Sequence, residues 1–133
     1  MKYITRCLEG TKVVSNHKIS IKFGGIKTVI NEQCLNHLST FKGREKAAQI
    51  KLKQTQLLPI FINQNILLFP SKSIRNMDAH YINYHEVLSV SKKCFDTEII
   101  FKDLSTLMLD VSYKKIKNQM SKAKKLIYEN DCV

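Results

Sequence analysis

The stretch that decides the fold runs from Phe41 to Pro70 and reads FKGREKAAQIKLKQTQLLPIFINQNILLFP. A turn at Gly43 precedes residues 44–53, which are strong helix formers without Gly or Pro and include four cations. Two apolar runs follow at residues 57–62 and 66–69, and the Asn-rich residues 63–65 separate them. Runs of that length joined by a short polar link predict a β-hairpin that is buried on both faces. A basic helix therefore leads into a buried hairpin, which would give the helix a rigid base.

The residues before this stretch predict strands and one short helix. Residues 3–30 lack helical periodicity, and residues 19–23 alternate between apolar and polar side chains. Such alternation is typical of a strand with one wet face, so Ile19, Ile21 and Phe23 are expected to face the core. Residues 26–30 favour a further strand. Asn31 is expected to cap a short helix that ends near Ser39.

The residues after the hairpin predict a loop, three strands and a helix. Residues 71–80 are polar, whereas residues 87–90, 97–101 and 106–111 suit strands with short links, as in an antiparallel meander. Ser112 is expected to cap a C-terminal helix whose opposite side is crowded with lysines. Its apolar stripe repeats at helical spacing and consists of Tyr113, Ile116, Met120, Ala123 and Ile127.

These elements predict an α+β fold in one domain over residues 1–133. We expect an antiparallel sheet that can curl into a barrel, two short helices and a C-terminal amphipathic helix. A meander closed by one C-terminal helix also suits a pleckstrin-homology-like barrel, which is the alternative architecture. A chain of 133 residues is long enough to bury a core without disulfide or metal staples.

The charge of the chain indicates a polyanionic partner. Lys and Arg number 22 against 11 Asp and Glu, so the net charge is +11 and the isoelectric point is about 9.6. A field of that sign attracts nucleic acid, an anionic membrane surface or an acidic protein. The sequence is also rich in Lys, Ile and Asn, which an AT-rich coding bias would favour, but such a bias explains only part of the excess.

No pattern in the sequence predicts an enzyme. The chain has four glycines and neither a P-loop nor a GxGxxG motif. Cys34 and His37 share a helix face at ligand spacing, but two ligands do not make a metal site, so a buried core thiol is the preferred interpretation of Cys34. We therefore expect no cofactor, no metal and no small-molecule substrate.

The termini, the apolar runs and the cysteines suggest a cytoplasmic protein with no membrane partner. The N-terminus MKYITRCLEG lacks the apolar segment of a signal peptide. The longest apolar runs are far shorter than the roughly 20 residues that cross a bilayer. The four cysteines, Cys7, Cys34, Cys94 and Cys132, are scattered, which is typical of thiols in a reducing compartment.

Four features between Cys34 and Leu126 resemble the ComK family of competence transcription factors. They are the Phe-x-Gly-Arg pattern of residues 41–44, the Phe-Pro pair that closes the hairpin, YINYHEV at 81–87, and the Ser-Tyr-x5-Gln-x3-Ala pattern of residues 112–123. The resemblance implies a sequence-specific activator of DNA-uptake genes. It also implies a homo-oligomer that reads paired AT-rich boxes in double-stranded promoter DNA through the minor groove.

The C-terminal end is expected to differ from that of longer family members. Those members carry an additional tail linked to activation and regulated proteolysis, whereas this sequence stops at Val133, shortly after the last helix. The expectation is DNA binding without that layer of control, or a paralogue with a different set of target genes.

The candidate DNA-binding residues lie on the two basic helices and in the polar loop. Arg44 is the candidate reader of a narrow minor groove, because arginine senses groove shape and Gly43 would let the backbone approach closely. The alternative is that Arg44 caps or salt-bridges locally. A rival function is a module that docks on anionic lipid or protein. The full set is Lys42, Arg44, Lys46, Lys51, Lys53, Arg75, Lys114, Lys115, Lys122, Lys124 and Lys125.

Overall fold

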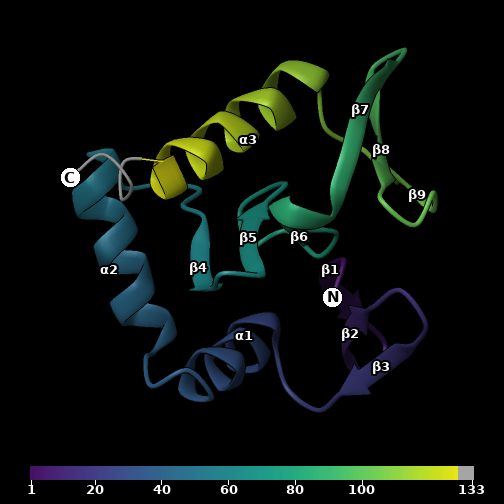
Figure 1. The fold of residues 1–133 in the computed structure, drawn as a ribbon. Coiled ribbons are helices and arrows are strands. Elements are labelled where there is room, and N and C mark those ends of the chain that lie inside the picture. The colour runs from purple at the N-terminus through teal and green to yellow at the C-terminus, as the bar shows by residue number, and fades with distance from the viewer. Residues whose placement is uncertain (129–133) are drawn as a thin grey trace.

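The computed structural model describes residues 1–128, which form two antiparallel sheets and three α-helices (Figure 1). The α+β class, the antiparallel strands and the C-terminal helix are thus confirmed. The larger sheet contains β1 (Tyr3–Cys7), β2 (Gly10–Val14), β3 (Ile19–Lys22), β4 (Ile60–Asn63), β5 (Ile66–Pro70) and β6 (His80–Asn83). The smaller sheet contains β7 (Val87–Lys93), β8 (Asp96–Phe101) and β9 (Thr106–Leu109). The helices are α1 (Ile26–Leu35), α2 (Phe41–Leu52) and α3 (Tyr113–Tyr128), and a short 3₁₀ turn, η1 (Tyr84–Glu86), leads from β6 into β7.

Neither sheet closes into a barrel. The strand order of the larger sheet is β3-β2-β1-β6-β5-β4, so β3 and β4 are its two edges. The smaller sheet is a separate meander in the order β7-β8-β9. The strands of residues 1–128 therefore do not form a pleckstrin-homology-like barrel, because they divide between two open sheets whose faces are covered by helices and by each other.

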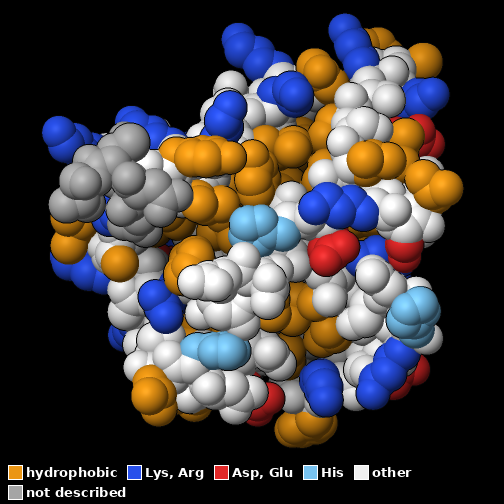
Figure 2. Space-filling model, in the orientation of Figure 1, with side chains coloured by type: hydrophobic (Ala, Val, Ile, Leu, Met, Phe, Trp, Pro, Cys, Tyr) orange, Lys and Arg blue, Asp and Glu red, His pale blue; other side chains and the backbone are white. Residues whose placement is uncertain are grey.

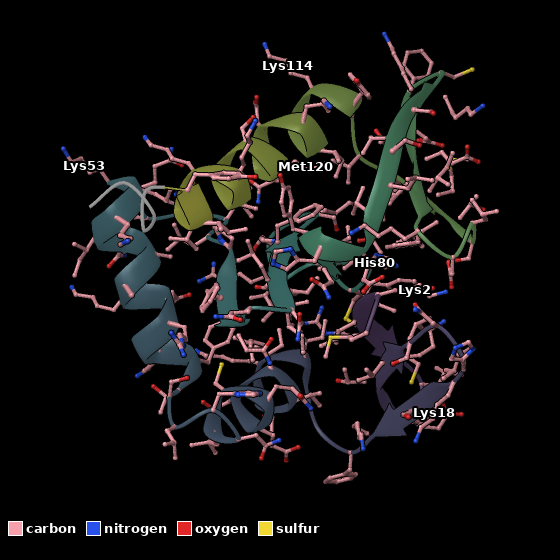
Figure 3. All side chains as sticks on the ribbon, viewed as in Figure 1. Lys2, Lys18, Lys53, His80, Lys114 and Met120 are labelled. Carbon is pink, nitrogen blue, oxygen red and sulfur yellow. The ribbon has the colours of Figure 1, made fainter. Side chains whose placement is uncertain are left out.

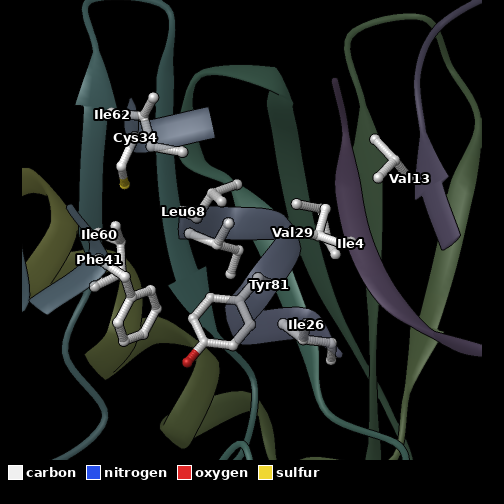
Figure 4. Close-up of a cluster of buried hydrophobic side chains, with 11 residues drawn as sticks. Ile4, Val13, Ile26, Val29, Cys34, Phe41, Ile60, Ile62, Leu68 and Tyr81 are labelled. Carbon is white, nitrogen blue, oxygen red and sulfur yellow. The ribbon is translucent and has the colours of Figure 1, made fainter. Parts of the chain in front are cut away.

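One face of the larger sheet packs against α1. Apolar side chains of the strands, such as Ile4 and Leu68, meet Ile26 and Val29 of α1 in a single buried cluster, which Figure 4 shows in close-up. Tyr81 closes this cluster, and burial raises the pKa of its phenol to about 12. Cys34 is fully buried here and burial raises the pKa of its thiol, which agrees with a core thiol.

The other face of the larger sheet packs against the smaller sheet and α3. Phe69 and Ile82 of the larger sheet meet Ile99 and Phe101 of the smaller sheet and Ile116 of α3. Adjacent residues of β5 therefore point into different clusters, with Leu68 on the α1 side and Phe69 on the α3 side. The hairpin is buried on both faces, as its two apolar runs predict.

The predictions for the N-terminal third were wrong in three places. Residues 26–30 are helical, because Ile26, Val29 and Ile30 fall at helical spacing and all three point into the core. Gly25 is the N-cap of α1, whereas Asn31 lies within the helix and its side chain accepts a hydrogen bond from the Phe41 backbone N–H. Residues 19–23 do not face the core either.

The apolar side of β3 is exposed because β3 is an edge strand. Ile19, Ile21 and Phe23 are 63%, 49% and 95% exposed. Alternation correctly identified the strand, but the core ends at β2, where Val14 is buried beside Ile19 in the register of the sheet.

A buried asparagine joins three parts of the chain near the second sheet. Asn83 donates hydrogen bonds to the carbonyls of Met1 and Asn65 and accepts one from the backbone N–H of Leu67. The YINYHEV segment is therefore a strand only as far as this residue, after which η1 turns the chain into β7. Its other strand residues, Tyr81 and Ile82, fill the clusters on either face.

Candidate nucleic-acid interface

The two basic helices pack against each other through their C-terminal halves (Figure 1). Ala48 and Leu52 of α2 share a buried cluster with Ala123 and Leu126 of α3. Figure 2 shows Lys and Arg side chains gathered along the edge of the molecule that follows α3 and the adjoining end of α2. The C-terminal end of α2 and the exposed surface of α3 therefore lie on the same cationic side of the protein (Figure 2).

α3 docks by one stripe and presents cations on the rest of its surface. Ile116, Gln119, Ala123 and Leu126 are buried, and Met120 lies on the strand-facing side in Figure 3. The buried stripe thus includes a glutamine and a leucine that the apolar pattern omits. The exposed lysines of this helix are Lys114, Lys115, Lys117, Lys124 and Lys125, of which Lys117 was not among the predicted residues.

Lys122 differs from the other lysines of α3. It is half-buried, its ammonium donates a hydrogen bond to the Gln56 carbonyl at 3.3 Å, and burial lowers its pKa. Lys122 therefore helps to hold α3 against the segment that joins α2 to β4, and less of its charge faces solvent.

α2 starts earlier than Gly43, and most of its lysines are exposed. Thr40 is the N-cap, and its hydroxyl accepts a hydrogen bond from the Gly43 backbone N–H at 2.9 Å. Gly43 therefore lies in the first helical turn, where a Cβ would approach the Thr40 hydroxyl to 3.0 Å. The helix ends at Lys53, whose left-handed backbone (φ 54°) stops it. Lys42, Lys46 and Lys53 are exposed, whereas Lys51 is half-buried.

Arg44 is held against the body of the protein. Its Nε donates a hydrogen bond to the Ser39 hydroxyl at 3.0 Å, and its guanidinium lies 5.4 Å from the centre of the Phe61 ring. Both contacts are local to the helix start and to strand β4. The geometry therefore favours the alternative in which Arg44 stabilises its own surroundings, through a hydrogen bond and a cation–π contact.

Arg75 lies on the exposed loop between β5 and β6. The loop spans residues 71–79, and the Arg75 side chain is exposed. Its backbone N–H bonds to the Ser73 hydroxyl at 3.3 Å, while its guanidinium makes no hydrogen bond, ion pair or ring contact with the described residues. Of the three arginines, Arg75 is the one whose charged group is uncommitted within residues 1–128.

The loop, α3 and the tip of the β7–β8 hairpin border one cleft of about 600 Å³. Ser73 and Asn76 line it from the loop, Phe95 from the hairpin tip, and Lys115 and Gln119 from α3. Lys72 and Asp110 also reach the cleft, but Lys72 pairs with both Asp78 and Asp110. The cleft is open to solvent, and Arg75 lies on the loop that forms part of its rim, although its own side chain does not line the cleft.

Two lysines outside the helices extend the cationic side and were also not among the predicted residues. Lys92 and Lys93 are exposed at the end of β7, beside the hairpin tip that carries Phe95. The available signal was a Lys-Lys pair directly before the short link between two predicted strands.

Acidic groups close to the core are neutralised internally. Asp103 accepts hydrogen bonds from the hydroxyl and backbone N–H of Ser105 and from the ammonium of the buried Lys2, and these bonds lower its pKa to about 2.

Within residues 1–128, no three His, Cys, Asp or Glu side chains are grouped to hold a metal ion. Cys132 lies outside the described residues. No helix in the described part of the chain is long and apolar enough to span a bilayer.

The ComK protein family matches residues 4–132, nearly the whole sequence. The chain belongs to the ComK family. ComK proteins are competence transcription factors and not a family of enzymes, so the chain is assigned to transcription regulation. No curated protein and no solved structure matches it.

The ComK features of the sequence have clear structural roles. Gly43 completes the N-cap of α2, and Phe69 is fully buried between the two sheets. The Gln119 side chain donates hydrogen bonds to the carbonyls of Leu57 and Pro70 at 2.9 and 3.0 Å, which ties α3 to β5. Ala123, four residues later, is fully buried against α2. These residues therefore build the scaffold of the protein.

Proposed function

We propose that this ComK protein is a sequence-specific, DNA-binding activator of competence genes that acts in the cytoplasm as one domain. The observation that carries the proposal is the packing of α2 against α3, which places the lysines of both helices along one side of a protein with a net charge of +11. The phosphates of a duplex lie along its length, so cations gathered on one side of a protein suit them better than scattered ones.

The proposed contacts divide into phosphate contacts and groove contacts. The exposed lysines Lys42, Lys46, Lys53, Lys114, Lys115, Lys124 and Lys125 would meet phosphates, with Lys51 and Lys122 at the margin. Phosphate contacts position a protein but carry no base information. Specificity for AT-rich boxes would come from an arginine in the minor groove, which is narrow in A-tracts and has an enhanced negative potential there.

We also propose that the protein binds paired boxes as a homo-oligomer, through the open edge of its larger sheet. Edge strand β3 carries the exposed Ile19 and Ile21, and the exposed Phe23 follows directly after it, whereas the opposite edge strand, β4, packs beside α2. An exposed apolar edge strand can pair with a second copy of itself about a two-fold axis. Light scattering should therefore find an oligomer that Ile21→Lys dissociates and that a control, Leu104→Lys on the exposed β8–β9 turn, leaves intact. A monomeric wild-type protein would refute this part of the proposal.

The DNA proposal is tested by a binding titration at several salt concentrations. Affinity for a duplex should fall linearly in a log–log plot against salt, with a slope of about −0.9 for each phosphate neutralised. Replacing thymine by uracil removes only a major-groove methyl group, so it should hardly change the affinity. A flat salt response would refute DNA binding, and a strong response to the methyl group would refute minor-groove reading.

The rival function is docking on anionic lipid. The same lysines would serve it, but the open sheets lack the barrel on which that alternative was based. Acidic vesicles and an AT-rich duplex, offered in competition, separate the two functions. Retention on vesicles without a preference between AT-rich and GC-rich duplexes would favour the lipid module.

A further inference from the structure

We infer that Arg75, presented by the braced β5–β6 loop, is the arginine that reads the minor groove of AT-rich DNA. The inference rests on the proposed DNA-binding function and assigns its specificity to one side chain. It replaces Arg44 as the candidate reader, because the guanidinium of Arg44 is already engaged by Ser39 and Phe61.

The first argument is that the loop is held on both sides of Arg75. The guanidinium of Arg6, on strand β1, donates hydrogen bonds to the carbonyl oxygens of Ile74 and Asn76, the two residues that flank Arg75. The side chain of Ile74 packs against the cluster beneath the larger sheet. One arginine is therefore used to fix the backbone that carries another.

The second argument is that both ends of the loop are also fixed. The backbone N–H of Ser71 donates to the His80 carbonyl at 2.8 Å, and the His80 N–H donates back to the Ser71 hydroxyl at 3.0 Å. The Thr5 hydroxyl donates to the Ala79 carbonyl at 3.0 Å, and Lys72 pairs with Asp78 across the loop. Because the loop is ordered before binding, little conformational entropy remains to be lost when Arg75 engages a groove.

The third argument is the chemistry of the loop tip. Arg75 is exposed without a side-chain partner among the described residues, and Met77, two residues later, is 76% exposed. Minor-groove proteins combine cationic side chains with apolar wedges such as methionine that enter between base steps. A guanidinium is more weakly hydrated than an ammonium, so arginine suits a narrow groove better than lysine does.

The fourth argument is the position of the loop beside α3. The loop and α3 border the same cleft, which Lys115 lines from α3 and Ser73 and Asn76 line from the loop. A duplex whose phosphates meet the exposed lysines at the start of α3 would bring a groove edge to the loop. Phosphate contact and groove contact can then be made by neighbouring elements at once.

The test compares substitutions in the intact chain on two duplexes of equal length, one with a central A-tract and one GC-rich. Arg75→Ala should weaken binding to the A-tract duplex at least about fivefold more than binding to the GC-rich duplex, as expected for the loss of one specific contact. Arg75→Lys keeps the charge, so it should retain the salt slope yet lose much of the A-tract preference. The matched control is Lys46→Ala on α2, which also removes one exposed charge and should weaken both duplexes equally.

The outcomes separate the inference from the proposed function. If Arg75→Ala keeps the wild-type A-tract preference, or if folded Arg44→Ala loses it, Arg75 is not the reader although DNA binding stands. A wild-type protein that binds both duplexes equally also overturns the inference. A wild-type protein that binds neither duplex overturns the proposed function and the inference with it.

Discussion

The substitution Gln119→Met should destabilise the protein by about 1.5–4.5 kcal/mol, because one buried amide holds α3 on the sheet. The Gln119 side chain is buried, and its Nε2 donates to the carbonyls of Leu57 and Pro70. Methionine has a similar length and fills the space, so the packing change is small and the loss is mainly polar.

The magnitude follows from the surroundings of the two carbonyls. The bond to Pro70 is buried, and an acceptor left unsatisfied there costs about 1–3 kcal/mol. Leu57 is 38% exposed, so water can replace the amide, and the loss is that of an ordinary hydrogen bond, about 0.5–1.5 kcal/mol. The two contributions together give the expected range.

Urea unfolding followed by circular dichroism measures the effect, since the chain has no tryptophan to report by fluorescence. The control is Asn118→Met, one position earlier on the exposed side of α3, which should stay within about 0.5 kcal/mol of wild type. A Gln119→Met variant as stable as this control would refute the reasoning, because it would mean that α3 docks through its apolar stripe alone.

Two further predictions concern the charged surface and the buried phenol. Replacing Lys114 and Lys115 by Ala should reduce the magnitude of the salt slope of duplex binding by about 1.8. Replacing the exposed Lys18 and Lys22 of the β3 region should change the slope little. Equal effects of both pairs would argue against α3 as the phosphate-binding helix. Burial raises the pKa of Tyr81 to about 12, so its phenol stays protonated in the folded protein at pH values where the unfolded chain ionises. The contribution of this pKa difference to stability is therefore complete below about pH 10 and is lost as the pH rises towards 12, a change of about 2–3 kcal/mol. The substitution Tyr81→Phe should abolish this change, which urea titrations over the same pH range measure. An identical alkaline loss of stability in both proteins would contradict the prediction.

The parts of the fold that sequence patterns predicted are those set by local patterns. The hairpin of β4 and β5 follows from two continuous apolar runs, the meander of the smaller sheet from short apolar segments with short links, and the long helix α3 from a repeat of 3.6 residues. These patterns lie within single segments, so the elements that they predict do not depend on which distant segments pack against them. The boundaries were off by a few residues where caps decide them, as at Thr40 for α2.

The parts that sequence patterns missed depend on contacts between distant segments. Ile19 and Ile21 alternate as core residues would, and only the strand order shows that β3 is an edge with nothing packed on it. Residues 26–30 contain β-branched side chains that favour a strand, but their helical spacing matches the face of the sheet that α1 covers. In both cases the outcome depended on which other segments cover the residues, and not on the local pattern.

The candidate site shows the same division. That a basic helix and a lysine-rich C-terminal helix exist could be inferred from composition and period, but the contact between their C-terminal halves could not. The contacts that each arginine makes could not be predicted from the sequence either. The ring that contacts the Arg44 guanidinium belongs to Phe61. The hydrogen bonds to the two residues that flank Arg75 come from Arg6, which is 69 positions away from Arg75 along the chain.

The contrast between Arg44 and Arg75 indicates how this protein can separate stability from recognition. For Arg44 to enter a DNA groove, its guanidinium would have to leave the Ser39 hydroxyl and the Phe61 ring, and breaking these two interactions would offset part of any binding energy. Arg75 has no such interactions to break among the described residues, and the hydrogen bonds that order its loop are made by Arg6 and remain in place when it binds. A groove-reading side chain on a fixed backbone can therefore contribute nearly its full contact energy to affinity. Under the proposed function, lysines on α2 and α3 would change the affinity for all DNA sequences alike, without altering which sequence is preferred.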